Sequence, residues 1–209
     1  MNRATRSETQ AHTRERLLDA ADRAFAEEGF AGASLDRIAG AAGLTRGAIY
    51  SNFVDKPDLF VAVLERRLER RSAEIGDALA GAVDPDAFVA MLRDPTWTGA
   101  SATDDGRRWM LLRDEFRLYA LRNPAAAKRL ARHERRERDN YAAASTALLK
   151  RLGVDAPIDQ RLIAAIIFAL DESLARQHVI DPEDVAASSF ADALNLLLRA
   201  AVALAREVD

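Results

Sequence analysis

LDRIAGAAGLTRGAIYSNFVDKPDLF, residues 35–60, predicts two short helices that are joined by a glycine turn and followed by a longer helix. Ser34 stands before the first short helix as an N-cap, and Thr45 stands before the second. Gly43 lies between them, where the chain needs the positive φ that glycine adopts most easily. Together the caps, the turn and the apolar spacing predict a helix-turn-helix.

The longer helix has a strong start signal. Asp55 offers a side-chain cap, Pro57 suits the first turn, and Asp58 places negative charge near the positive end of the helix dipole. Apolar residues then recur at spacings of three and four as far as Ile75. The pattern predicts a helix over residues 56–79 that connects an N-terminal bundle with the rest of the chain.

The remainder of the chain also has helical patterns. Before the motif, apolar residues recur at helical spacing until Gly29, a common type of helix stop. After it, we predict helices at 84–92, 107–122, 124–151, 158–177 and 183–206, with a loop at 93–106. The fold prediction is therefore all-α, with roughly nine helices. It comprises a three-helix domain over residues 1–56 and a helical C-terminal domain over residues 57–209.

The composition excludes several classes of protein. Of 209 residues 49% are hydrophobic, which is enough to bury a substantial core. The chain has no cysteine, and its three histidines lie far apart, so no disulfide, thiolate or local metal motif is expected. Adjacent carboxylates such as Asp171 and Glu172 point about 100° apart on a helix and do not converge on one substrate. We therefore expect no enzyme, no catalytic residue, no metal and no cofactor.

No targeting or membrane segment is expected. Residues 1–14 have no apolar core of the kind that a signal peptide needs, and no later run approaches about 18 uninterrupted apolar residues. These patterns predict a soluble, cytoplasmic protein without a membrane partner.

The charge balance alone does not indicate nucleic-acid binding. The chain has 30 Lys and Arg residues against 33 Asp and Glu, a net charge of −3. Residues 1–60 contain 8 basic and 9 acidic residues by direct count. Four arginines nevertheless crowd the start of the first predicted helix, at positions 3, 6, 14 and 16, which allows a local basic face.

The second short helix of the motif has features that suit the major groove of DNA. Arg46 lies at its N-terminal end, where it could bind a phosphate or pair bidentately with guanine. Gly47 weakens the helix by about 1 kcal/mol relative to alanine, and one benefit is close approach of DNA. Ile49 and Phe53 would face inward. The candidate DNA contacts are Ser34, Thr45, Arg46, Gly47, Tyr50, Asn52 and Lys56. The alternative is a three-helix bundle that does not bind DNA.

Residues 43–50, GLTRGAIY, with Asn52-Phe53, Asp55-Lys56 and Leu59-Phe60 after them, resemble the signature of the tetracycline-repressor (TetR) family of bacterial regulators. The resemblance covers residues 10–68. It implies a three-helix DNA-binding domain, a helical ligand-binding and dimerisation domain, and release from an operator when a small molecule binds. It also places DNA contacts on the seven candidate residues named above.

Two predicted helices of the C-terminal domain carry candidates for a ligand pocket with an apolar wall and polar anchors. These candidates are Trp109, Leu112, Arg113, Phe116, Tyr119, Phe168 and Asp171. A core stripe is the alternative for each of them, because a helix bundle needs such stripes whether or not it holds a ligand. Trp97, in the predicted loop, would either cover the pocket or pack on the surface.

The last two predicted helices have wide apolar faces, which predict a homodimer through these helices; burial within one chain is the alternative. Their apolar residues are Ile163, Ile166, Ile167, Leu170, Leu174, Leu194, Leu197, Leu198, Ala201 and Leu204. The predicted function is a ligand-responsive transcriptional regulator, most simply a repressor that a small-molecule effector releases from a near-palindromic double-stranded DNA operator. The alternative is a helical small-molecule-binding or interaction protein that does not bind DNA.

Overall fold

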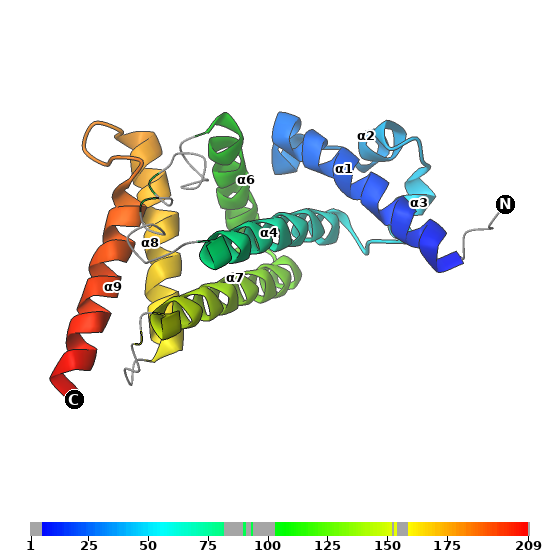
Figure 1. Cartoon of the computed structure of the whole chain (residues 1–209). Helices are drawn as coiled ribbons and strands as arrows, with labels where there is room; N and C mark the ends of the chain where they lie inside the picture. The colour runs from blue at the N-terminus through cyan, green and yellow to red at the C-terminus, as the bar shows by residue number, and fades with distance from the viewer. Residues whose placement is uncertain are drawn as a thin grey trace. The chain divides into compact units, whose positions relative to one another are not determined.

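The computed structural model describes residues 6–81, 90, 93, 103–151, 153 and 159–208, and all regular secondary structure in this part of the chain is helical (Figure 1). The helices are α1 (Arg6–Gly32), α2 (Leu35–Ala41), α3 (Arg46–Tyr50), α4 (Lys56–Gly81), α6 (Asp104–Ala120), α7 (Pro124–Arg151), α8 (Gln160–Ile180) and α9 (Ser189–Val208). The all-α prediction is confirmed. The short helix predicted at 84–92 lies, apart from Ala90, outside the described residues, and so does Trp97.

Helix α6 begins at Asp104 rather than at residue 107. The reason is a cap that the sequence analysis overlooked, because the Thr103 hydroxyl accepts a hydrogen bond from the Gly106 N–H at 3.0 Å. The prediction that the loop continues to residue 106 is therefore wrong at its C-terminal end. Most of the rest of that loop lies outside the described residues.

Helix α9 begins at Ser189 rather than at residue 183. The preceding residues form turns, in which the Asp184 N–H donates to the Asp181 side chain at 3.2 Å. His178 Nδ1 lies 2.7 Å from the Val185 carbonyl oxygen and ties the same turns to the end of α8. The Asp-Pro sequence thus starts a turn segment and not a helix.

The described contacts divide the chain into two compact units: unit 1 comprises residues 1–67 and 111–133, and unit 2 comprises residues 68–110 and 134–209. Helices α4, α6 and α7 therefore each contribute one segment to each unit. The domain boundary predicted at residue 56 stays a prediction. Unit 1 extends beyond it because Leu59 in the first turns of α4 is fully buried in the core of this unit.

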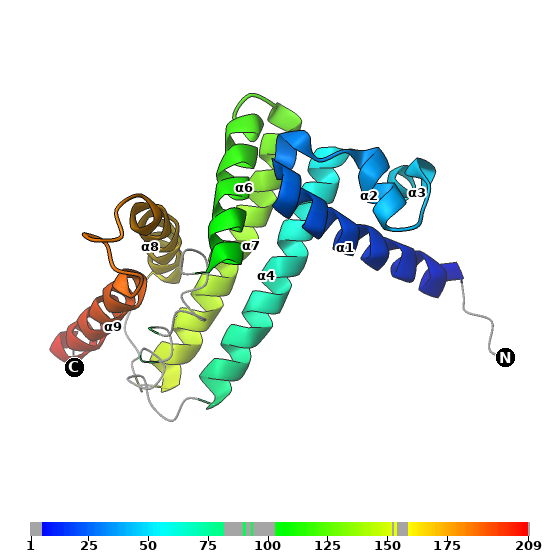
Figure 2. The same ribbon diagram turned by 90° about the horizontal axis from the view of Figure 1, so that it is seen from above.

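The core of unit 1 lies where α1 and α4 meet the short helices and the C-terminal part of α6. Figure 1 and Figure 2 both show α2 and α3 beside α1. Aromatic rings connect these helices: Phe60 lies 4.9 Å from Phe25 and 4.6 Å from Phe116, and Phe30 lies 4.9 Å from Phe116, measured between centroids. Burial of each ring contributes roughly 1.5–3 kcal/mol, so this cluster is a major source of stability for unit 1.

The core of unit 2 joins the ends of α4 and α7 to α8 and α9, which lie side by side (Figure 1, Figure 2). Its buried residues are Leu79, Leu148, Leu149, Ile167, Ala191, Leu194, Leu198 and Ala201. Four apolar residues on which the dimer prediction relied, Ile167, Leu194, Leu198 and Ala201, are therefore core residues of the chain itself. None of the described helices is both long and apolar enough to span a membrane.

Candidate nucleic-acid interface

The turn between α2 and α3 has the predicted glycine conformation. Gly43 adopts a φ of 64°. Its N–H donates to the Gly40 carbonyl at 2.9 Å, and the Leu44 N–H donates to the Ala39 carbonyl at 2.8 Å. This pair of bonds is the Schellman arrangement, which ends a helix at a left-handed residue. The turn fixes the direction in which α3 leaves α2.

Two arginines of α1 bind the carbonyl ends of the short helices. Arg16 Nη2 donates to the Ala42 carbonyl at 2.6 Å, and Arg14 Nη1 donates to the Asn52 carbonyl at 3.3 Å. The Arg14 guanidinium also lies 4.4 Å from the centroid of the Phe53 ring. A cation at a helix C-terminus offsets the dipole and satisfies free carbonyl groups. These two members of the predicted basic face thus hold the helix-turn-helix together.

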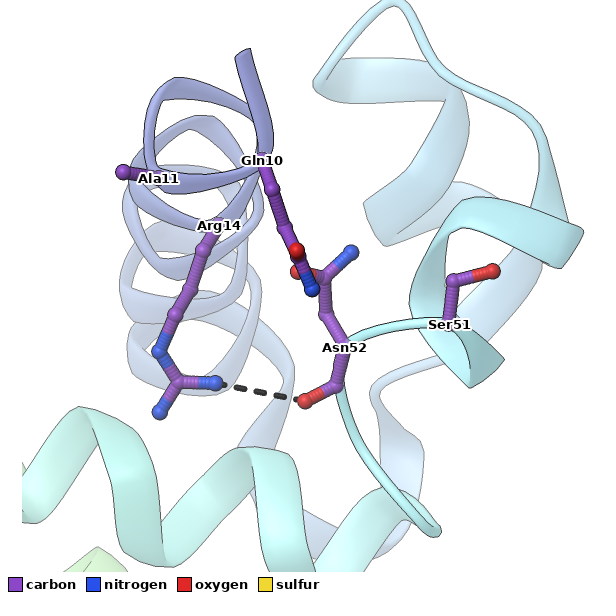
Figure 3. A pocket seen from close by; sticks show the side chains of 5 residues that line it. All are labelled: Gln10, Ala11, Arg14, Ser51 and Asn52. Carbon is purple, nitrogen blue, oxygen red and sulfur yellow. Dashed lines mark hydrogen bonds between the residues drawn. The ribbon is translucent and has the colours of Figure 1, made fainter. Parts of the chain in front are cut away.

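An open pocket of about 280 Å³ lies between α1 and the end of α3 (Figure 3). It is lined by Gln10, Ala11, Arg14, Ser51 and Asn52. The Gln10 side chain extends from α1 toward the Asn52 side chain. Asn52 Nδ2 donates back to the Ala48 carbonyl of α3 at 2.8 Å. The predicted DNA contact of Asn52 stays a prediction, and the bond to α3 uses one of the two hydrogens on its amide nitrogen.

The outer surface of α3, here called the α3 face, consists of Thr45, Arg46, Gly47 and Tyr50. All four residues are exposed, with Tyr50 at 50% of its maximum, whereas Ile49 on the inner side is 0% exposed. Phe53 is buried as well, so both residues expected to face inward do so. The helix therefore presents polar side chains to a partner and anchors itself from behind.

Two details of the caps and the glycine refine this picture. Ser34 and Thr45 occupy the predicted N-cap positions with extended backbone, but neither side chain makes the capping hydrogen bond. A Cβ added to Gly47 would meet no atom closer than Thr45 Oγ1 at 3.6 Å, an ordinary contact. The protein's own packing therefore does not require glycine there, and the contact of Gly47 with DNA stays a prediction.

Arg46 is oriented by two side chains. Its Nη1 atom lies 2.9 Å from Asp36 Oδ2 in an ion pair across the α2–α3 turn, and its Nη2 atom donates to Tyr50 Oη at 3.1 Å. The hydrogen bond to Tyr50 and the charge of Asp36 raise the pKa of Arg46 above its ordinary value. Arg46 therefore stays a cation, and its remaining N–H groups are available to a nucleic acid.

Lys56 has a different environment from Arg46. Its Nζ atom donates to the Ala31 carbonyl at 3.0 Å and lies 5.0 Å from the centroid of the Phe30 ring. Burial lowers the pKa of Lys56, and the charges of Glu115 and Glu28 oppose that shift. The structure thus places this predicted DNA contact against the end of α1, where one of its three N–H donors already binds the Ala31 carbonyl.

Comparisons with known proteins agree with this geometry. The sequence profile of the bacterial regulatory proteins of the tetR family matches residues 17–63. The HTH-type transcriptional repressor AcnR of Corynebacterium diphtheriae is 32% identical over 148 residues, which are 70% of this chain and 71% of AcnR. The chain belongs to the tetR family. As a member of the family it is a DNA-binding transcriptional regulator.

Two further comparisons differ in how much of the chain they cover. The HTH-type transcriptional regulator AcrR of Shigella flexneri is 51% identical over 65 residues, 31% of this chain and 30% of AcrR, so the match spans less than a third of that relative. A crystal structure from Rhodococcus sp., described as that of a TetR-family transcriptional regulator, superposes with a TM-score of 0.72 at 20% identity. It covers 90% of this chain and 99% of that one, and at such low identity it shows that the fold is shared.

Sequence reasoning missed Glu115 of α6, which binds the interrupted end of α1. Its carboxylate accepts hydrogen bonds from the Phe30 and Ala31 N–H groups, both at 2.8 Å. The interruption is at Gly29, where φ is 75° and ψ is 169°. The positive φ favours glycine there, and a Cβ would also lie 3.0 Å from Glu115 Oε2 and press on the carboxylate.

Arg129 of α7 was also missed. Its Nη1 atom donates to both carboxylate oxygens of Asp55, at 2.8 and 2.9 Å, and its Nε atom lies 3.7 Å from Asp58 Oδ1. Asp55 is the predicted cap of α4 and accepts from the Asp58 N–H at 2.8 Å, which confirms that prediction. No local pattern indicates the arginine, because 74 positions separate it from its partner.

The seven candidate ligand residues are divided between the two units. Leu112, Arg113, Phe116 and Tyr119 belong to unit 1, and Trp109, Phe168 and Asp171 belong to unit 2. Phe116 is fully buried in the aromatic core, which matches the core alternative for that residue. Their role in ligand binding stays a prediction.

The candidates in unit 2 lie in a polar and aromatic cluster. Tyr141 Oη donates to Asp171 Oδ2 at 2.7 Å, and the Tyr141 and Phe168 rings are 6.5 Å apart. The Arg138 guanidinium lies 5.4 Å from the centroid of the Phe168 ring. Within the described part of the chain, no group of three or more His, Cys, Asp or Glu side chains is placed to hold a metal ion.

Proposed function

We propose that this TetR-family regulator is a repressor that binds a near-palindromic operator as a homodimer and leaves it when a small molecule binds to unit 2. Its site of action would be chromosomal DNA in the cytoplasm. The main support is the outward placement of Arg46 and Tyr50 on a short helix that is anchored by the fully buried Ile49. A helix with one exposed polar side and a tight turn before it suits insertion into the major groove.

A dimer supplies two such helices for successive major grooves, about 34–36 Å apart. Apolar surface for a two-fold contact remains on the last two helices after the core is formed. Leu196 and Leu204 on α9 are 70% and 56% exposed, and Leu162 on α8 is 58% exposed. A four-helix contact between α8 and α9 of two chains would bury such residues.

Release of the operator requires a connection between ligand and α3. Helices α4, α6 and α7 contribute to both units, so a shift of these helices in unit 2 would be transmitted along them. In unit 1, Glu115 attaches α6 to the end of α1, and Arg129 attaches α7 to the start of α4. A coupling of about 1–3 kcal/mol between ligand and operator would change affinity about 5- to 150-fold.

The DNA-binding part is tested by selection from a pool of randomised duplexes. Fluorescence anisotropy then compares the selected duplex with a scrambled one at two salt concentrations, because sequence-independent binding declines steeply as salt rises. Arg46→Ala should weaken binding to the selected duplex by about 5- to 150-fold, the range for loss of a bidentate base contact. Arg135→Ala, an exposed arginine of α7, is the matched control and should bind as the parent does.

Two results would contradict this assignment: a parent protein that enriches no sequence, or an Arg46→Ala variant that binds as tightly as the parent. Ligand control is tested by adding a protein-free metabolite extract to the preformed complex. We expect the extract to lower the anisotropy with the parent and to do so less with Asp171→Asn, because Asp171 belongs to the polar cluster of unit 2. An extract that never releases the complex would count against a ligand-controlled repressor.

A further inference from the structure

The ion pair between Asp36 and Arg46 places a negative charge beside the surface proposed to meet DNA. Asp36 lies in the first turn of α2, and Arg46 is the first residue of α3. Their side chains are 62% and 56% exposed. An ion pair with this exposure contributes little to folding, so stability does not explain the position of the carboxylate.

Arg46 differs in this respect from two arginines of α1 that bind the ends of the short helices. Arg14 and Arg16 donate to neutral backbone carbonyl groups, which do not offset their charge. Arg46 is paired with a carboxylate, so the local net charge of the pair is close to zero. Sequence-independent binding depends on unpaired positive charge near phosphates. The pair therefore contributes little to such binding, and Asp36 itself repels the phosphates.

The same contacts leave Arg46 able to recognise a base. Each Nη atom carries two hydrogens, and each donates one of them internally, to Asp36 or to Tyr50. One hydrogen on each Nη atom and the one on Nε remain for a base edge. Asp36 and Tyr50 hold the guanidinium from two directions. The side chain is therefore already restricted before DNA binds, and a bidentate contact with a base costs less conformational entropy.

We propose that Asp36 is a specificity-determining positioning residue, which holds Arg46 for guanine recognition and penalises phosphate contacts at other sequences. This inference rests on the proposed function. At a correct site, the directed hydrogen bonds of Arg46 to a guanine compensate for the repulsion of Asp36. At an incorrect site that compensation is missing and the repulsion remains. The repulsion lowers both affinities, whereas the guanine bonds of the positioned Arg46 raise only the affinity for the correct site, so Asp36 increases the ratio of the two.

The test is Asp36→Asn, which keeps the size and one acceptor oxygen but removes the charge. Affinity for the scrambled duplex should rise about fivefold at low salt, the effect of one nearby unit charge in water. The slope of log affinity against log salt should become steeper by about one for that duplex. The selected duplex also loses the repulsion, but it loses the positioned bonds of Arg46 as well, so its affinity should stay nearly unchanged and the ratio of selected to scrambled affinity should fall about fivefold. Asp139→Asn, an exposed aspartate of α7, makes the same chemical change elsewhere and should leave the ratio unchanged.

Two more variants show whether Asp36 acts through Arg46. In an Arg46→Ala background, Asp36→Asn should alter both affinities alike and leave their ratio unchanged. Tyr50→Phe removes the second anchor of Arg46 without changing charge, so it should lower the ratio without changing the salt slope. All of these side chains are exposed, and thermal unfolding should be unaffected.

The possible results distinguish the inference from the function on which it rests. If the parent enriches a sequence and Asp36→Asn leaves the ratio unchanged, the inference is wrong while the proposed function stands. If Asp36→Asn lowers the ratio equally in the Arg46→Ala background, Asp36 contacts a base itself and the positioning role is wrong. If the parent enriches no sequence, the proposed function fails and this inference fails with it.

Discussion

The α3 face and the break in α1 at residues 29–31 both depend on charged side chains, but these side chains have different partners. On the α3 face, Arg46 pairs with the neighbouring Asp36, and both side chains are more than half exposed. At the α1 break, Glu115 and Lys56 bind backbone N–H and carbonyl groups of α1. Substitutions on the α3 face should therefore change DNA binding first, whereas substitutions at the α1 break should change stability first.

The largest effect is expected beneath the α1 break, at Phe116. Its ring is 0% exposed and packs on Phe60 and Phe30. Phe116→Ala should lower the free energy of unfolding by about 3–5 kcal/mol, the usual cost of a large cavity in a core. Urea denaturation measures the change. Leu118→Ala, an exposed leucine of the same helix, should stay within about 0.5 kcal/mol of the parent.

A small loss of stability with Phe116→Ala would contradict the expectation that substitutions near the α1 break change stability first. It would mean that the ring is not required for the core, and the prediction that Phe116 binds a ligand would regain support. A large loss would leave Phe168 and Asp171 in unit 2 as the stronger candidates for ligand binding.

The second prediction concerns the carboxylate at the α1 break. Glu115→Gln replaces one acceptor oxygen with an NH₂ group, which faces a backbone N–H donor. The loss of a charge-assisted bond and the unpaired donor should lower the free energy of unfolding by about 1–3 kcal/mol. Urea denaturation again provides the measurement, with Glu69→Gln on the exposed side of α4 as the control. Equal stability of Glu115→Gln and the parent would show that water replaces the bond without cost.

The contrast between the two regions also explains what the sequence could predict. The Gly43 turn, the Asp55 cap and the inward positions of Ile49 and Phe53 are confirmed because each depends on residues within a few positions. Helical periodicity and caps are local properties, so the all-α fold and the helix-turn-helix followed from them. The start of α9 was missed because a proline after aspartate is compatible with both a helix start and a turn.

The partners of long charged side chains could not be predicted in this way. Arg46 and Lys56 are both cations at the start of a helix, and their sequence contexts gave no reason to separate them. Their difference arises from the fold: the carbonyl that binds Lys56 is 25 positions away, and 85 positions separate Glu115 from the Phe30 N–H. Such contacts depend on how the helices pack, which the local pattern does not determine.

Lys56 is both a predicted DNA contact and a side chain bound at the α1 break, and the third prediction separates these two roles. Lys56→Ala removes the bond to Ala31 and the contact with the Phe30 ring, which should lower the free energy of unfolding by about 1 kcal/mol. It should also weaken binding to selected and scrambled duplexes alike and reduce the salt slope by about one. Lys128→Ala, an exposed lysine of α7, is the control for both measurements. An unchanged salt slope would remove Lys56 from the set of DNA contacts and leave it only its place at the α1 break.

The smallest effect is expected at an exposed Arg–Asp pair of unit 2, which resembles the Asp36–Arg46 pair but lies outside the proposed interface. Arg93 Nη2 lies 2.7 Å from Asp192 Oδ1, and both side chains are about half exposed, at 50% and 49%. The bond from Arg93, with help from Ser188, lowers the pKa of Asp192 below its ordinary value of 3.8. Because the folded carboxyl group of Asp192 then holds its proton less tightly than the unfolded one, the pair stabilises the protein above about pH 4, and this stabilisation disappears as the pH falls further.

The free energies of unfolding of the parent and of Arg93→Ala, measured by urea denaturation, should differ by about 0.5 kcal/mol or less near pH 6, and the difference should vanish near pH 2. A difference of several kcal/mol would show that exposed pairs do stabilise this fold, and the position of Asp36 would then need no explanation from DNA binding.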